Sequence, residues 1–290
     1  MSLLAGWSVH AIVLSVVLVA LFIYAVGFEP HHLEVVHTEA RIRDLPPGFD
    51  GYTISVLADF HQTPGDTLNT VRRAVKMALD AEPDLIVMLG DYGPSAKTTP
   101  RLSRWLYARS MRALTPVLTP LHARDGVLAV VGNHDYYGGM EYTRRWLESL
   151  GVRVLLNDAV RIQRGGETLV VGGVEDPLEG TPDPNGGIDP DTSSNREPTI
   201  VLSHNPDGIL HLNPKRRIDL VLSGHTHGGQ VVIPFFGAPI TSSRVCRWRH
   251  ASGWVPNDRV PLYVSRGVGT QTPVRFNCRP EVTILRLRNA

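Results

Sequence analysis

The sequence predicts an α/β fold in which short buried strands alternate with amphipathic helices. Five runs rich in Val, Ile and Leu have the length of buried strands. Helical patterns with one apolar face separate several of them, which favours parallel strands and right-handed crossovers. Each run also ends in residues that can bind a metal ion, and open α/β sheets bind their ligands at this end. The runs are residues 52–57, 85–89, 127–131, 200–202 and 218–222.

Composition limits the domain count and the classes of partner. With 290 residues the chain can hold one large α/β domain or two small ones. Because 29 Lys and Arg nearly balance 28 Asp and Glu, no strong field attracts nucleic acid, and no nucleic-acid partner is expected. Cys246 and Cys278 are too few for a disulfide framework and are not spaced as a zinc site; whether they pair stays open.

Residues 1–28 are predicted to be an N-terminal membrane anchor. Residues 11–28 are apolar apart from Ser15 and reach the roughly 17–20 residues that a membrane-spanning helix needs. A secretory signal peptide is the alternative, with residues 25–27 as a cleavage site, but residues 1–10 lack its Lys and Arg. A buried soluble helix is disfavoured because the run has no amphipathic stripe. We therefore expect a retained single-pass anchor.

Residues 29–50 are predicted to be a polar connector whose histidines are solvated, followed by one domain at residues 51–290. Arg41 and Arg43 follow the apolar run, whereas residues 1–10 carry no Lys or Arg. This bias predicts that the domain lies on the cytoplasmic face of the membrane.

The first half of the domain should contain a βαβ unit and an arginine-rich helix. A helical pattern from Leu68 to Leu79 connects two of the buried runs, which should pair in parallel. Residues 99–121 predict a second helix with Arg101, Arg104, Arg109 and Arg112 among its polar positions. That helix could lie on a lipid surface. Packing on the sheet with an arginine-rich solvent face is the favoured alternative.

The second half predicts further strands and a long loop. Residues 141–150 predict a short helix, and residues 176–198, rich in Pro, Gly, Asp and Ser, predict a loop beside the metal centre. Arg266 and Arg275 could hold a substrate phosphate or form structural ion pairs, and the sequence leaves both alternatives open. The further strands are expected at residues 152–156, 169–174, 262–265 and 282–287.

The ends of the five buried runs carry the candidate ligands. His225 and His227 lie two positions apart, so both side chains share one face of an extended segment. One buried strand that ends in Asp or His is unremarkable, but five in one chain indicate a transition-metal site. The candidate metal ligands are Asp59, His61, Asp91, Asn133, His204, His225 and His227.

The order of these motifs resembles a known superfamily. The series D-x-H, G-D, G-N-H-D, S-H and G-H-T-H is similar to the calcineurin-like metallophosphoesterases. The surrounding SHNPD, SGHTHGGQ, YVSRG and RPE resemble the membrane-anchored bacterial phosphodiesterase branch. The likeness covers roughly residues 50–288. It implies two facing mixed β-sheets flanked by helices, so that residues 51–290 would form the metallophosphoesterase domain after one transmembrane helix.

The resemblance also implies a role for each candidate residue. Asp91 would bridge two divalent metal ions, and manganese, iron or zinc suits the donor types better than calcium. His134 would be the general acid or would stabilise charge on the leaving group, with Asp135 orienting its ring. The implied ligand sets are Asp59, His61 and His227 for one ion, and Asn133, His204 and His225 for the other.

One position departs from the pattern of the superfamily. The second motif usually reads G-D-x-x-D/E, but here it runs from Gly90 and Asp91 to Pro94. The acidic residue that is missing normally supports the ligands from behind, so its absence affects the expected metal affinity or identity.

The implied activity is hydrolysis of a phosphodiester or pyrophosphate bond. An anchor beside the site suggests a lipid-linked substrate, such as the UDP-diacylglucosamine that some relatives cleave in lipid A synthesis. The alternative is a catalytically inactive scaffold that keeps the fold to bind proteins. The presence of every ligand type favours the enzyme.

Overall fold

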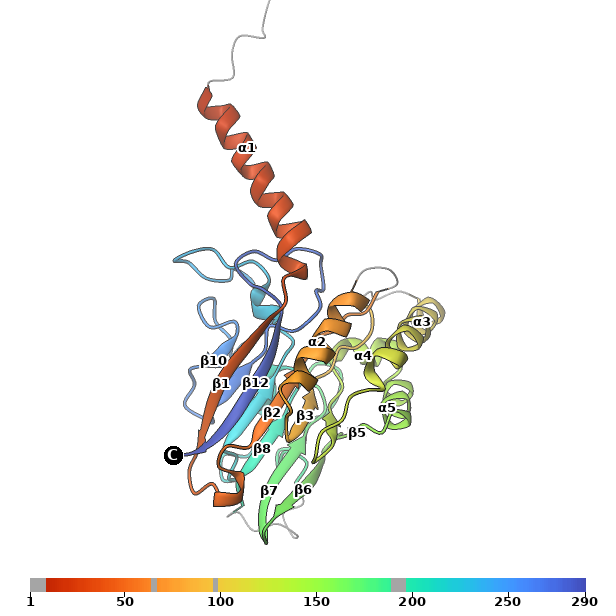
Figure 1. Cartoon of the computed structure of the whole chain (residues 1–290), viewed down its shortest axis with the longest axis vertical. Coiled ribbons are helices and arrows are strands. Elements are labelled where there is room, and N and C mark those ends of the chain that lie inside the picture. Colours follow the sequence, from red (N-terminus) through yellow and green to blue (C-terminus); the bar gives the residue numbers. More distant parts are fainter. Residues whose placement is uncertain (1–8, 64–66, 96–98, 189–196) are drawn as a thin grey trace, which may run out of the picture.

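The computed structural model of the chain describes residues 9–63, 67–95, 99–188 and 197–290 (Figure 1). Two six-stranded sheets face each other, and both contain parallel and antiparallel neighbours. The predicted fold class, two facing mixed sheets flanked by helices, is confirmed.

The first sheet has the strand order β1-β12-β2-β3-β4-β5. Strands β2 to β5 are parallel, β12 is antiparallel to β2, and β1 is parallel to β12. The predicted parallel βαβ unit is formed by β2, α2 and β3. Bounds are β1 Glu34–Ile42, β2 Thr53–Leu57, β3 Leu85–Met88, β4 Val127–Ala129, β5 Arg153–Val154 and β12 Glu281–Asn289.

The second sheet has the order β10-β11-β9-β8-β7-β6. Its four central strands are parallel, and its two edge strands, β10 and β6, are antiparallel to their neighbours. Bounds are β6 Asp158–Arg164, β7 Glu167–Gly173, β8 Thr199–Leu202, β9 Leu220–Ser223, β10 Gly253–Val255 and β11 Leu262–Val264.

Apolar side chains fill three layers. One cluster lies between the two sheets, and a second lies between the first sheet and its helices (Figure 1). The outer face of the second sheet is covered by loops and by the 3-10 turn η4, Pro206–Leu210. The helices are α2 Leu68–Asp80, α3 Pro100–Leu118, α4 Asn133–Gly138 and α5 Met140–Ser149.

Helix α3 follows the favoured alternative from the sequence. Tyr107, Met111 and Leu114 are buried in the cluster under the first sheet, while the arginines of the helix are exposed. The helix therefore packs on the sheet along its apolar face.

The prediction of a connector at residues 29–50 is wrong for much of this stretch. Strand β1 forms the edge of the first sheet and pairs with β12 over its whole length. Arg266 joins this edge to the sheet through ion pairs with Glu34, at 2.6 Å, and with Glu281. The side chains of β1 alternate between partly buried and exposed. Because many of them are polar, the sequence of this strand resembles that of a connector.

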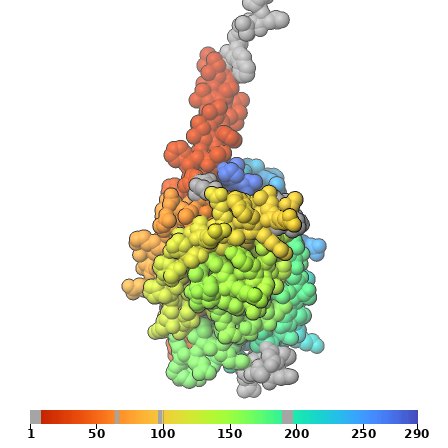
Figure 2. All heavy atoms as spheres, turned by 90° about the vertical axis from the view of Figure 1, so that its right-hand side faces the viewer, coloured from red at the N-terminus to blue at the C-terminus, as the bar shows by residue number. Residues whose placement is uncertain are grey.

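Helix α1, Val9–Ile23, projects from the body with its apolar side chains exposed (Figures 1 and 2). It continues through a π-helical turn, Tyr24–Phe28, and a 3-10 turn, Glu29–His31. The combined helix spans 23 residues and is long and apolar enough to cross a membrane by length and composition. Residues 1–8, part of the predicted anchor, lie outside the described residues.

The base of this helix is fixed to the body. The Arg275 amide donates to the Ala25 carbonyl at 2.9 Å, and the buried Glu29 carboxylate accepts from the Cys278 amide. Cys278 and Cys246 are both buried and free, so they do not pair.

Candidate metal centre

The structure brings all seven predicted ligands together at the carboxyl ends of central strands from both sheets. Strands β2, β3 and β4 lead into the ligands of the first sheet, and β8 and β9 into those of the second. The ligand atoms form two groups, each within 4.8 Å: Asp59, His61 and His227 in one, and Asp91, His204 and His225 in the other.

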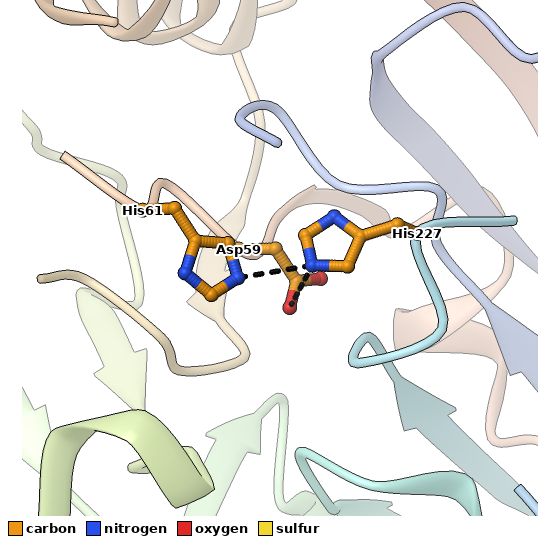
Figure 3. A group of neighbouring side chains, drawn as sticks. All are labelled: Asp59, His61 and His227. Carbon is orange, nitrogen blue, oxygen red and sulfur yellow. Dashed lines mark hydrogen bonds and ion pairs between the residues drawn. The ribbon is translucent and has the colours of Figure 1, made fainter. Parts of the chain in front are cut away.

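In the first group, two imidazoles point ring nitrogens at one another beside a carboxylate (Figure 3). The Nε2 atoms of His61 and His227 are 2.9 Å apart, and His227 Nε2 is 3.9 Å from Asp59 Oδ1. Both Asp59 oxygens accept from the His225 amide at 3.1 Å, which holds the carboxylate in place. All three side chains are buried.

In the second group, acceptor atoms converge. His204 Nδ1 faces the Leu89 carbonyl at 2.7 Å, and His225 Nε2 faces the Ser242 carbonyl at 3.2 Å. A ring N–H must point at each carbonyl, so in the neutral rings the opposite nitrogens carry lone pairs. Those nitrogens lie 3.2 and 3.0 Å from Asn133 Oδ1. When both rings are neutral, the cluster therefore presents acceptors without a donor, which fits a bound cation.

Asp91 belongs to the second group and also approaches the first. Its Oδ2 is 3.5 Å from His61 Nε2 and 3.3 Å from His204 Nε2, while Oδ1 accepts from the His134 amide at 3.0 Å. One carboxylate therefore reaches both sets of ligand atoms, as a bridging ligand must.

Burial sets the protonation of most of these side chains. It lowers the pKa of His61 to about 3 and that of His225 to about 4, so both rings are neutral near pH 7. Neutral imidazole is the form that binds a metal ion. Burial also raises the pKa of Asp59 to about 7.

His204 behaves differently because of Asp91. Burial alone would lower its pKa, but the nearby carboxylate outweighs burial and raises the pKa well above its ordinary range. The same contact holds the pKa of Asp91 well below its usual value, against the opposing effect of burial. Positive charge is thus strongly favoured at this point between the ligand groups.

The backbone adopts a left-handed conformation at several ligands. The φ angles are 53° at Asp59, 41° at His61, 57° at Asp91, 70° at His225 and 50° at His227. Such conformations of residues other than glycine cost on the order of 1–3 kcal/mol each and persist where surrounding structure imposes them. The fold thus holds strain at the positions that present the ligands.

Two motif glycines are required by close approach. A Cβ atom at Gly132 would lie 2.2 Å from Asp91 Oδ1, and one at Gly224 would lie 2.5 Å from Asp59 Oδ2. Any side chain at either position would displace a ligand carboxylate.

The prediction that Asp135 orients the His134 ring is wrong. The buried Asp135 carboxylate accepts from the amides of Gly132, Asp91 and Tyr92 at 2.8–3.0 Å and from the Tyr107 hydroxyl at 2.9 Å. Among the described residues no hydrogen bond joins it to the His134 ring. Asp135 instead fixes the backbone that presents Asp91.

His134 lies at the edge of the centre, with Nε2 4.0 Å from Asp91 Oδ2. The same nitrogen is 3.0 Å from the Gln271 side-chain nitrogen. Sequence reasoning missed Gln271, which no motif marks. Gln230 lies at the end of the G-H-T-H-G-G-Q motif and bonds the segment that carries Gln271. Its side chain accepts from the Gln271 amide at 3.2 Å and donates to the Val274 carbonyl at 2.8 Å.

The remaining open positions have structural roles. Arg266 forms the ion pairs of β1 described above, so its structural alternative holds. Arg275 is fully buried and donates to the backbone carbonyls of Arg266 and Gly269 at 2.7 and 2.6 Å. Pro94 is buried at the position where the superfamily pattern has an acidic residue.

Residues 52–229 match the family model described as calcineurin-like phosphoesterase, which is more than half of the chain. The chain belongs to this family. The phosphodiesterase YaeI of Escherichia coli (strain K12) is 33% identical over 267 residues, covering 89% of this chain and 90% of YaeI. The uncharacterized metallophosphoesterase YkuE of Bacillus subtilis (strain 168) is 31% identical over 271 residues, covering 92% of this chain and 89% of YkuE.

A transmembrane protein with metallophosphoesterase domain from Danio rerio is 28% identical over 299 residues, covering 99% of this chain and 64% of that protein. The resemblance inferred from the motifs is confirmed. As a calcineurin-like phosphoesterase, the chain is a metal-binding hydrolase of phosphate esters. This finding favours the enzyme over the catalytically inactive scaffold that was the alternative.

The contacts of Asp135 lead to a specific expectation for Asp135→Asn. The new amide group would turn an N–H toward backbone donors, leaving a buried donor unpaired at about 1–3 kcal/mol. The variant should melt at lower temperature and lose bound metal, measured by calorimetry and elemental analysis. A stable, fully metal-loaded variant that is slow only in turnover would restore the role beside His134.

Proposed function

We propose that this calcineurin-like phosphoesterase hydrolyses phosphodiester or pyrophosphate bonds with two divalent transition-metal ions. One observation carries the proposal: the Asp91 carboxylate reaches both ligand groups, at 3.5 Å from His61 and 3.3 Å from His204. Asp59, His61 and His227 would hold one ion, and Asn133, His204 and His225 the other. Manganese, iron or zinc suits these donors.

The two ions would lower the pKa of a water and withdraw charge from the phosphoryl oxygens. The residues of the chain supply orientation and a proton. Carbonyls of Leu89 and Ser242 fix the rings of His204 and His225, so their free nitrogens point inward. His134, at the edge of the centre, would give a proton from Nε2 to the leaving group.

Asp91→Asn tests the bridging role. Replacing the shared carboxylate with a neutral amide should remove both ions and activity together, because each group loses a charged ligand. Asp59→Asn, a matched change in one group, should lower the metal content of the other group far less. Elemental analysis of purified protein measures both, and two retained ions in active Asp91→Asn would contradict the dinuclear proposal.

His134→Ala separates catalysis from metal binding. Because the His134 ring lies outside both ligand groups, the variant should keep its metal content while turnover of a generic diester falls by about 10²–10⁴. Activity with bis(p-nitrophenyl) phosphate and elemental analysis are measured on the same preparation. Loss of metal comparable to that in His225→Ala would reassign His134 as a ligand.

We further propose that α1 anchors the enzyme and that the substrate is lipid-linked, of the UDP-diacylglucosamine type. Support comes from α1, which has no buried residue and exposes its apolar side chains, and from the hydrogen bonds that fix the base of the helix to the body. An anchor next to the site raises the effective concentration of head groups at the metal centre.

The domain should lie on the cytoplasmic face. Arg41 and Arg43 follow the apolar helix, and no Lys or Arg precedes it in residues 1–10, so the basic side is the carboxyl-terminal one. Fusions at residue 290 to a reporter that works only in the cytoplasm should be active. Activity from a reporter that requires export would reverse the orientation.

A further inference from the structure

A loop beside the metal centre exposes several large apolar side chains to solvent. Phe235 is 99% exposed, Ile240 72% and Phe236 54%, and Trp248 is 43% exposed. We call residues 233–248 the apolar loop. Neighbouring apolar side chains exposed on a protein surface usually mark an interaction site.

The apolar loop has a defined conformation. Ile233 and Gly237 exchange backbone hydrogen bonds of 2.9 and 2.8 Å, which closes a tight turn with Phe235 near its tip. The rings of Phe236 and Trp248 lie 4.9 Å apart, and the Ala238 amide donates to the Trp248 carbonyl at 2.5 Å. Phe235 itself has φ of 66°, an unfavourable conformation for a bulky residue. The loop therefore holds Phe235 outward.

The apolar loop is connected to the base of the N-terminal helix. Val231, just before the loop, forms a β-bridge with Phe276, and the Val232 amide donates to the Phe276 carbonyl at 2.8 Å. The preceding residue, Arg275, donates its amide to the Ala25 carbonyl of that helix. Figure 1 shows the pale blue loops of this region at the foot of α1. The loop and the helix thus emerge from the same end of the body.

The charge carried by residues 233–249 suits an anionic lipid surface. Arg244, Arg247 and Arg249 are exposed, and the sequence has no Asp or Glu from residue 230 to residue 257. The Arg249 guanidinium lies over the Trp248 ring, 4.7 Å from its centroid. Aromatic side chains with neighbouring arginines are typical of segments that sit at the membrane interface.

The loop also borders the metal centre. A cavity of about 280 Å³ is lined by His225 and His227 of the metal centre, by Pro239 and Ile240 of the loop, and by Gln271. Ile240 is thus both a wall of this cavity and an exposed side chain of the loop. A phosphoester at the depth of lipid head groups would meet the cavity without leaving the bilayer.

We propose that the apolar loop inserts into the lipid head-group region beside α1 and holds the mouth of the metal cavity against the bilayer. The partner is a lipid surface that contains anionic lipids. The inference rests on the proposed anchoring by α1. It adds a second, shallow membrane contact, which anchoring by α1 does not by itself imply.

Labelling of one introduced, exposed cysteine in the full-length protein tests the loop. Both native cysteines are 2% exposed, so a cysteine introduced at an exposed site is the one that reacts. Phe235→Cys reports on the loop, Val16→Cys on the middle of α1, and Gln163→Cys on the hairpin of β6 and β7 at the far end of the body (Figure 1). Each variant carries an environment-sensitive fluorophore in vesicles of phosphatidylcholine and phosphatidylglycerol.

Nitroxide-labelled lipids should quench the labels at positions 235 and 16 but not the label at 163. Quenching at 235 should be stronger with a shallow than with a deep nitroxide, because interfacial segments reach about 5–10 Å into the boundary of the acyl chains. The label at 16 should show the reverse order.

Three results would overturn the inference, and they are distinguishable. Quenching at 16 with none at 235 would leave the anchor intact and place the loop in water. A label at 235 that is shifted to the blue without lipid quenching would also contradict it, because the loop would then face protein, such as a second copy of the chain. Quenching at neither 16 nor 235 would remove the proposed anchor as well.

Discussion

The fixed position of the Asp91 carboxylate is the constraint on which the rest of the structure depends. Its two oxygens contact both ligand groups and the His134 amide, so a small displacement would separate the centre into unrelated halves. Asp135 holds the Asp91 amide from behind, and Gly132 leaves room for the carboxylate itself. The left-handed backbone at the ligands persists because such contacts impose it, and the two packed sheets supply the rigidity that this requires.

Sequence reasoning located the centre because central strands are easy to recognise. The runs before Asp91 and His204, residues 85–89 and 200–202, are continuous stretches of apolar residues, and the run before Asp59 is mostly apolar; in each case the ligand follows within two residues. The strands that the sequence did not reveal, β1, β6 and β10, all lie at the edges of the sheets. Edge strands are half exposed and carry polar residues, so their composition resembles that of loops.

The contacts that sequence reasoning assigned wrongly or missed are long-range. Asp135 was expected to orient the ring of its neighbour His134, yet its carboxylate accepts hydrogen bonds from backbone amides of the loop after β3. Gln271 contacts His134 from a distant segment, and Gln230 accepts a hydrogen bond from the Gln271 amide of that segment. A side chain's direction depends on packing and on local dihedral angles, which motif spacing does not encode. The end of the body that carries α1 shows the same principle, since the link from Ala25 through Arg275 to the apolar loop joins segments far apart in the chain.

The dinuclear centre is the central claim of this account, and anomalous X-ray diffraction from crystals grown with manganese tests it most directly. The account predicts two anomalous peaks about 3.5–4 Å apart, on opposite sides of Asp91 Oδ2, one beside His61 and the other beside His204. A single peak at full occupancy, or two peaks of which neither lies within coordinating distance of Asp91, would contradict it.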